Sequence, residues 1–311
     1  MKYIFIANPN AGKKDSSSSI RQQIAPYSDM ELYLTRGTRD ATRFVNSYCS
    51  EHPDEEVCFV ACGGDGTICE VASGMVGHPN ACLACFPVGS GDDYVKYFRD
   101  VDGIAKERFL DVKALREGSN RKVDIMEVTV GGGANDGTYY SINVCNFGFD
   151  AMVCRTMIEV KRKPIIGGRN SYTTGIVKAI FTSRYNHVTI AVDGKPFNDE
   201  TFMLCTLGNG RYVGGAYCCC PLSRNDDGLI EVNLIKPVSI PRFAFLVGEY
   251  KKGTHINKPR LRKFLPYTQG KCVELSHSEP FWVSIDGELL CGTHYTIRQL
   301  HQAINLRVPK A

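Results

Sequence analysis

Short apolar runs separated by amphipathic segments occupy the first third of the chain. The six apolar residues Val57–Cys62 predict a buried strand, and apolar side chains at helical spacing after Thr67 predict a helix with one buried face. Strands are predicted at Lys2–Ala7, Met30–Thr35, Val57–Cys62 and Ala81–Val88, and helices at Ser16–Ala25, Arg39–Cys49 and Thr67–Val76. This alternation favours a parallel, doubly wound α/β sheet covered by helices on both faces.

After about residue 122 the pattern changes to strands joined by tight turns such as Asn135-Asp136-Gly137 and Asp193-Gly194. Strands are predicted at Val123–Val130, Tyr139–Val144, His187–Val192, Thr201–Thr206, Leu229–Ile235, Lys271–Leu275 and Phe281–Ile285. Helical insertions are predicted at Ala151–Val160 with Ser171–Thr182, and at Pro241–Tyr250. We therefore expect two domains, residues 1–122 and an antiparallel β-sandwich at 123–311, and leave open a return of the extreme C-terminus to the first.

Composition narrows the class of protein only moderately. The 311 residues are 43% hydrophobic and 23% charged, which is ordinary for a globular protein, and a net charge of +4 does not favour nucleic acid as a partner. No apolar run approaches the ~20 residues that span a bilayer, and Tyr3–Ala7 is too short for a signal peptide, so a cytoplasmic location is expected. The fourteen cysteines are expected to be free thiols. A zinc or redox site is the weaker alternative, because Cys82 and Cys85 would face opposite sides of a strand.

The segment Gly63-Gly64-Asp65-Gly66-Thr67 lies where the third predicted strand meets its helix. Glycines let a backbone approach a ligand closely, and the N–H groups of a helix start attract anions. Asp65 would repel a phosphate unless a metal ion or a proton transfer involves it, so the segment indicates nucleotide phosphate chemistry. It is not a Walker P-loop, because no Gly-Lys-Ser or Gly-Lys-Thr follows. A plain strand-to-helix turn is the alternative.

Further motifs follow in a fixed order along the chain. They are Asn8–Lys13, Gly63–Thr67, Phe86–Tyr94, Lys122–Ile125, Asn143–Asp150, Gly208–Gly215, Asp226–Ile230 and Ile285–Glu288. This series closely resembles the diacylglycerol kinase catalytic-domain family, which includes bacterial lipid kinases and sphingosine kinases. The resemblance implies an ATP-binding domain like those of phosphofructokinases and NAD kinases, a β-sandwich, and an active site between them. It also implies transfer of the γ-phosphate of ATP to a lipid hydroxyl, with Mg²⁺.

The resemblance assigns roles to individual positions. Nucleotide contacts fall on Asn8, Thr35, Gly63, Gly64, Gly66, Thr67, Gly89 and Ser90. Asp286 is implied as general base, Glu288 as its neighbour in the magnesium network, and Asp65 and Asp124 as members of the same acidic cluster. A structural metal is implied at the carbonyls of Arg224 and Leu229 and the side chain of Asp227. Judged locally, Asp286-Gly287 is also a common hairpin turn.

The segment Gly89–Tyr94 departs from the family pattern Gly-Thr-x-Asn-Asp-Phe, and Ser90 in place of threonine keeps the hydroxyl. Asp92 stands where the family has asparagine, which should weaken phosphate contacts unless magnesium or Lys96 compensates. The resemblance favours diacylglycerol as acceptor and phosphatidic acid as product. The alternatives are a sphingoid base, phosphatidylglycerol, NAD, or a nucleotide- or lipid-binding regulator without turnover.

The expected partners follow from the same resemblance and from two basic segments. A membrane lipid is expected as substrate, with peripheral membrane contact through Lys161-Arg162-Lys163 and the basic segment Lys258–Lys263. Related bacterial enzymes also imply a homodimer.

Overall fold

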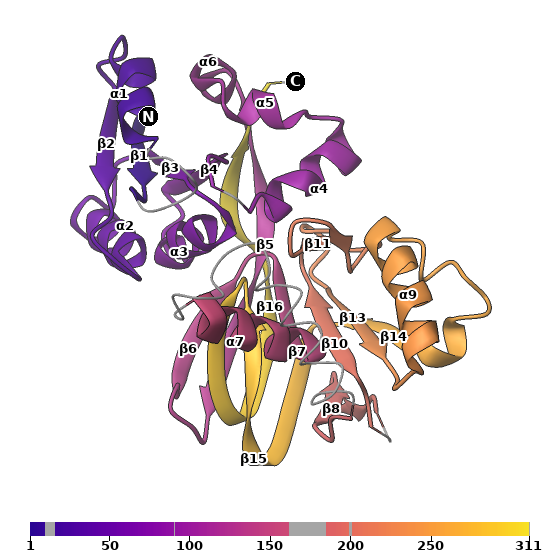
Figure 1. Cartoon of the computed structure of the whole chain (residues 1–311). Helices are drawn as coiled ribbons and strands as arrows, with labels where there is room; N and C mark the ends of the chain where they lie inside the picture. Colours follow the sequence, from indigo (N-terminus) through magenta and orange to yellow (C-terminus); the bar gives the residue numbers. More distant parts are fainter. Residues whose placement is uncertain (10–15, 90, 162–184, 199–200, 311) are drawn as a thin grey trace. The chain divides into compact units, whose positions relative to one another are not determined.

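The computed structural model describes residues 1–9, 16–89, 91–161, 185–198 and 201–310 (Figure 1). The chain forms two compact units. The first consists of Met1–Ile125, Asn225–Gly228 and Leu300–Ala311, and the second of Met126–Arg224 and Leu229–Gln299. The division after Ile125 lies close to the boundary predicted from the sequence. The predicted helix at Ser171–Thr182 lies outside the described residues.

The first unit contains the predicted parallel sheet. Its strands are β1 (Lys2–Ala7), β2 (Met30–Leu34), β3 (Val57–Cys62) and β4 (Ala81–Phe86), in the order β2-β1-β3-β4. The last part of β16 (Glu288–Val308) pairs in parallel with β4 through residues 305–307. Every residue of β3 and β4 is buried, which explains why these strands are continuous apolar runs.

Helices accompany this sheet along the chain. They are α1 (Ser17–Ile24), α2 (Asp40–Glu51), α3 (Asp65–Met75), α4 (Asp93–Asp102), α5 (Lys106–Phe109) and α6 (Val112–Arg116). The first three correspond to predicted helices, whereas α4, α5 and α6 were not predicted. α2 and α3 pack closely, because a Cβ on Gly74 would lie 2.6 Å from the carbonyl oxygen of Thr42. The Thr42 hydroxyl donates to the carbonyl of Glu70 at 2.8 Å.

The second unit is an antiparallel β structure. Its strands are β5 (Ser119–Gly131, from Met126 on), β6 (Gly137–Ser141), β7 (Val144–Gly148), β8 (Thr189–Val192), β9 (Lys195–Pro196), β10 (Leu204–Gly208), β11 (Tyr212–Val213), β12 (Tyr217–Cys218), β13 (Ile230–Ile235), β14 (Tyr267–Gly270), β15 (Cys272–Ile285) and the first part of β16. The main path runs β14-β13-β10-β7-β15-β16. The predicted turn at Asp193-Gly194 joins β8 to β9, and both residues have positive φ, as a two-residue hairpin of type I′ requires.

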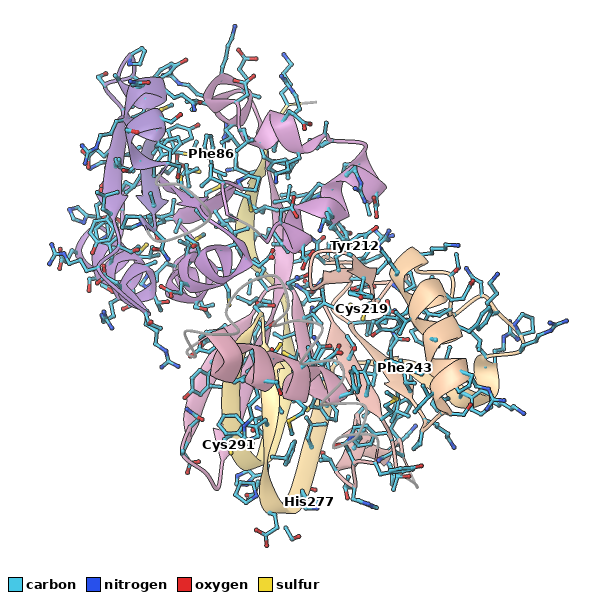
Figure 2. The ribbon with its side chains drawn as sticks, in the orientation of Figure 1. Phe86, Tyr212, Cys219, Phe243, His277 and Cys291 are labelled. Atoms are coloured by element: carbon cyan, nitrogen blue, oxygen red, sulfur yellow. The ribbon has the colours of Figure 1, made fainter. Side chains whose placement is uncertain are left out.

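Helices α7 (Phe149–Lys161) and α9 (Ile240–Lys252) and the 3-10 turn η1 (Arg262–Phe264) belong to this unit. α7 and α9 correspond to two of the predicted insertions. α9 buries Leu246 and Tyr250, and its Phe243 ring lies 5.2 Å from that of Phe149 (Figure 2).

The cysteines are free, and most are buried. Cys82 packs in the cluster with Cys58 and Cys62. Burial raises the pKa of the Cys58 and Cys62 thiols, so they behave as small apolar side chains. In the described part of the chain, no helix is long and apolar enough to cross a bilayer.

Candidate functional site

Two glycine-containing loops meet at the carboxyl ends of β3 and β4 in the first unit. The N–H of Gly89 donates to the carbonyl of Gly63 at 3.1 Å, and the N–H of Gly63 donates to the carbonyl of Phe86 at 3.2 Å. A Cβ on Gly89 would collide with the backbone nitrogen of Gly64, and one on Gly63 would collide with the Thr67 hydroxyl. Glycine is therefore required here by loop packing alone, independently of any ligand.

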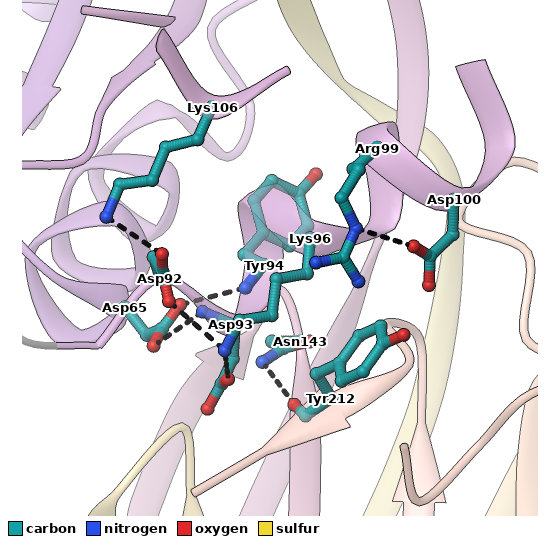
Figure 3. Close-up of polar contacts among 10 residues, drawn as sticks. All are labelled: Asp65, Asp92, Asp93, Tyr94, Lys96, Arg99, Asp100, Lys106, Asn143 and Tyr212. Atoms are coloured by element: carbon teal, nitrogen blue, oxygen red, sulfur yellow. Dashed lines mark hydrogen bonds and ion pairs between the residues drawn. The ribbon is translucent and has the colours of Figure 1, made fainter. Parts of the chain in front are cut away.

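Asp65, the first residue of α3, connects these loops to α4. One carboxylate oxygen accepts from the backbone N–H of Tyr94 at 2.9 Å, and the other from that of Asp93 at 3.2 Å (Figure 3). A Cβ on Gly91 would lie 2.7 Å from the same carboxylate. These two bonds make the Asp65 carboxylate a cap for the start of α4.

Asp92 and Asp93, at the start of α4, are surrounded by lysines. The Lys96 ammonium lies 2.8 Å from Asp93 and 3.1 Å from Asp92, and the Lys106 ammonium lies 2.8 Å from the other oxygen of Asp92 (Figure 3). Burial opposes ionisation of Asp92, but the bonds from Lys106 and Lys96 outweigh it and lower the pKa of that carboxyl. Burial likewise opposes the charge on Lys96, and the two aspartates raise the pKa of that ammonium. The charge that replaces the family asparagine is thus paired with two cations.

Asp124 is fully buried and belongs to the first unit. Its carboxylate accepts from the N–H of Gly228 at 2.7 Å, the N–H of Gln302 at 2.6 Å and the Nδ1 of His301 at 2.9 Å. Its own N–H donates to the carbonyl of Asn225 at 2.7 Å. These bonds give Asp124 a clear scaffolding role, since they hold three separate stretches of chain together.

The predicted structural metal loop divides between the units. Asp227 lies in Asn225–Gly228 of the first unit, and Arg224 and Leu229 belong to the second. Among the described residues, no cluster of three His, Cys, Asp or Glu side chains is arranged to hold a metal ion. A metal held partly by carbonyls stays a prediction.

Asp286 lies in the second unit, in the hairpin turn between β15 and β16. It has φ +46° and Gly287 has φ +91°, so the pair forms the tight turn that the Asp-Gly dipeptide indicates. The carboxylate also accepts from three successive backbone N–H groups: Ile142 at 2.9 Å, Asn143 at 3.2 Å and Val144 at 2.8 Å. Asp286 therefore forms a tight turn and also holds its carboxylate in a fixed orientation.

The remaining predicted positions lie as follows. Asn143 donates through its side chain to the carbonyl of Tyr212 at 3.1 Å (Figure 3), which ties the segment that holds Asp286 to β11. Thr35 is buried directly after the end of β2 and donates its N–H to the carbonyl of Ala7. Asn8 directly follows β1, and Glu288 is exposed at the start of β16. Ser90 lies outside the described residues.

Sequence reasoning missed Asp93 and Lys106 as members of this site. Asp93 is 5% exposed and contacts both Asp65 and Lys96. Two adjacent acids after a glycine turn, with a lysine three residues on, are the local signal for the pair with Lys96. The partner of Asp92 at Lys106 is fourteen residues away, so no local spacing predicts it.

Comparisons with known proteins agree with the resemblance. The model of the YegS C-terminal NAD kinase beta sandwich-like domain matches residues 143–308, and that of the diacylglycerol kinase catalytic domain matches residues 2–128. The chain belongs to the diacylglycerol kinase catalytic-domain family. This confirms the family and the fold class, an α/β domain followed by a β-rich domain.

Individual relatives match over nearly the whole chain. A protein of Xanthomonas campestris pv. campestris named "Probable lipid kinase YegS-like" is 24% identical, and the match covers 96% of this chain and 94% of the relative. Diacylglycerol kinase of Bacillus subtilis is 27% identical, with 98% and 95% covered. The crystal structure of a diacylglycerol kinase from Bacillus anthracis superposes with a TM-score of 0.67 at 19% identity, covering 98% and 96%, and supports the fold alone. The family is one of lipid kinases, and membership implies the use of ATP.

Proposed function

We propose that this chain transfers the γ-phosphate of ATP to the hydroxyl of diacylglycerol and forms phosphatidic acid. The observation that carries the proposal is the packing of the two glycine loops against each other beside the carboxylate of Asp65, at the carboxyl ends of parallel strands where α/β sheets bind ligands. The substrate class, a lipid, is inferred from the family.

The triphosphate would be held by the first unit. The groups proposed for it are the backbone of Gly63, Gly64, Gly66 and Gly89 and the side chains of Asn8, Thr35, Thr67 and Ser90. Mg²⁺ binds through one or two carboxylates together with phosphate oxygens and water, so a site that lacks three clustered protein ligands still fits it. Asp65 and Asp93 are the carboxylates that would hold it. When bound, the ion neutralises charge on the phosphates.

The acceptor hydroxyl would meet Asp286. Three backbone N–H groups fix the direction of this carboxylate, which is proposed to accept the proton of the hydroxyl. Phosphoryl transfer depends more on positioning than on a strong base, so a carboxylate held in a fixed direction suits the step. The hydroxyl oxygen bonds to the γ-phosphorus, its proton passes to Asp286, and ADP leaves. Glu288 is proposed to support this site, and Asp124 to hold its framework.

An acceptor assay tests the proposal. The purified chain is incubated with γ-labelled ATP, Mg²⁺ and, in separate reactions, vesicles that contain diacylglycerol, sphingosine or phosphatidylglycerol, or soluble NAD. Label in phosphatidic acid is the expected result. Label in another acceptor would contradict diacylglycerol as the substrate. ATP binding with no labelled product in any reaction would instead support a regulator without turnover.

Conservative variants test the two aspartates. We expect Asp65→Asn and Asp286→Asn each to lower kcat roughly 100-fold or more, because amides cannot accept the proton or neutralise the ion as carboxylates do. Asparagine tolerates positive φ and keeps one acceptor oxygen, so the turn at Asp286 should survive.

Asp193→Asn is the matched control. Asp193 also has positive φ in a hairpin turn, and its carboxylate accepts from the N–H groups of Lys271 and Cys272 at 2.9 Å. It should therefore lose stability as Asp286→Asn does while keeping kcat. Equal kcat losses in the two variants would show that Asp286 acts only through the fold.

Peripheral membrane contact, a cytoplasmic location and a homodimer stay predictions. Of the two basic segments, Arg162 and Lys163 lie outside the described residues, and Lys258–Lys263 lies in the second unit.

A further inference from the structure

Helix α9 exposes an apolar stripe. Ile240, Pro241, Ala244, Phe245 and Gly248 are all exposed, and their spacing of one, four, five and eight residues places them on one side of the helix. The side chains of Ile240 and Phe245 are 48% and 58% exposed. The opposite side of α9 packs on the second unit through Leu246 and Tyr250. A helix of a water-soluble domain normally shows polar residues on the side that α9 leaves apolar.

Basic side chains border this stripe. The Arg242 guanidinium lies 4.5 Å from the centre of the Phe264 ring, and the Lys263 ammonium lies 5.0 Å from it. The contact of Arg242 with Phe264 brings η1, with Arg262 and Lys263, beside the first turn of α9. Residues 240–264 contain seven lysines or arginines and one acid, Glu249, which pairs with Lys258 at 3.3 Å.

We propose that α9 and η1 form a docking surface for an anionic lipid bilayer, with Ile240 and Phe245 entering the headgroup region. The proposal rests on the proposed function, because a diacylglycerol substrate resides in a membrane. An exposed apolar stripe flanked by lysine and arginine is the arrangement of helices that lie in the bilayer interface. Each cation near an anionic surface adds attraction without contacting a particular lipid.

Two other occupants are disfavoured by the same residues. A second copy would bring two strongly basic surfaces together, and their charges repel. The phosphates of a nucleic acid could pair with the cations, but they offer no apolar surface to cover Phe245 and Ile240. An anionic bilayer accounts for both the apolar and the basic side chains.

Sedimentation with vesicles tests the surface in the full chain. The probes are vesicles of phosphatidylcholine alone and of phosphatidylcholine with phosphatidylglycerol. We expect binding to the anionic vesicles only. We expect both Ile240→Ser/Phe245→Ser and Arg262→Glu/Lys263→Glu to weaken that binding roughly tenfold or more. Added salt should weaken binding of the wild type much more than that of the charge-reversed variant.

Matched controls come from the same unit. Leu222→Ser removes an apolar side chain that is 47% exposed, and Lys195→Glu/Lys271→Glu makes the same change of charge at exposed positions outside the surface. Both should bind vesicles nearly as the wild type does. Equal losses of affinity for anionic vesicles in the control and surface variants would overturn the proposal. The proposal would also be overturned if Ile240→Ser/Phe245→Ser changed the molar mass in solution but not vesicle binding. It would equally be overturned if the surface variants lost affinity for a duplex oligonucleotide but kept their affinity for vesicles.

The test separates this proposal from the proposed function. Vesicle binding that depends on α9, without phosphorylation of any lipid, would leave the docking surface standing and contradict the kinase activity. Activity on diacylglycerol dispersed in detergent should be the same for wild type and surface variants, because these residues have no part in the chemistry. Phosphorylation in vesicles that the surface variants leave unchanged would contradict the docking surface alone.

Discussion

Asp92 shows how neighbouring residues can offset an unfavourable charge. A carboxylate beside the proposed phosphate-binding loop would repel the ligand, but Lys96 and Lys106 both contact this one. If the lysines offset the charge, Lys106 is needed only while Asp92 is charged. The two residues should therefore be coupled in their effect on nucleotide affinity.

We expect Lys106→Met to raise the Kd for ATP by about tenfold, because the Asp92 charge is then only half offset. In an Asp92→Asn background the same change should have an effect of less than about twofold. Calorimetric titration of ATP into the four proteins measures the coupling. If the effects of the two substitutions on the free energy of ATP binding simply added, Lys106 would instead contact the nucleotide directly.

Asp150 provides a pH-dependent test at the residue scale. Burial raises the pKa of this carboxyl, in the first turn of α7, to about 7. Because the folded pKa lies above the unfolded value, this group favours the folded state below about pH 4 and the contribution is lost as pH rises through 7. Asp150→Asn should therefore raise Tm relative to wild type at pH 8.5 and by much less at pH 5. Thermal melts at both values measure the difference, and an equal change at both would show that the charge of Asp150 is not the cause.

The two glycine loops pack so closely that a side chain at Gly89 would not fit between them. Gly89→Ala should destabilise the fold by about 1–3 kcal/mol, because its Cβ would meet the backbone of Gly64 and neither loop can move aside freely. Gly66→Ala is the matched control, since no atom lies within 4 Å of its Cβ and alanine favours a helix by up to about 1 kcal/mol. Denaturant unfolding measures both. A stable Gly89→Ala variant would show that the loops do not constrain each other.

Elements with a strong period were predictable, and those that depend on tertiary contacts were not. β1 and β3 are apolar runs whose bounds agree with the prediction, and α3 has its apolar stripe where helical spacing places it. α4 was missed because its start is capped by Asp65, which lies 28 residues before Asp93 in the chain. Asp286 shows the same limit at the site: the turn is readable from Asp-Gly, but the three N–H donors come from a segment more than 140 residues away.

The first unit is built from three separate parts of the chain, and Asp124 binds all of them. Its carboxylate, in β5, accepts from Gly228 in the middle part and from His301 and Gln302 in the last part. Loss of this carboxylate leaves buried N–H donors without an acceptor, which lowers the stability of the fold.

We expect Asp124→Ala to lower the free energy of unfolding by roughly 3 kcal/mol or more, and activity to fall with it. Denaturant unfolding and kcat, measured together, distinguish this from a purely catalytic role. Full stability with kcat lost would place Asp124 in the chemistry rather than in the framework. His301→Ala, which removes only one donor from a half-exposed ring, should have a much smaller effect.

The pairing of residues 305–307 with β4 also has a consequence for biosynthesis. A ribosome makes β4 well before residues 305–307, which pair along its open edge. Until those residues emerge, β4 presents unpaired backbone groups to any other nascent chain. A stop codon between the two would therefore leave the earlier strand with an uncovered edge.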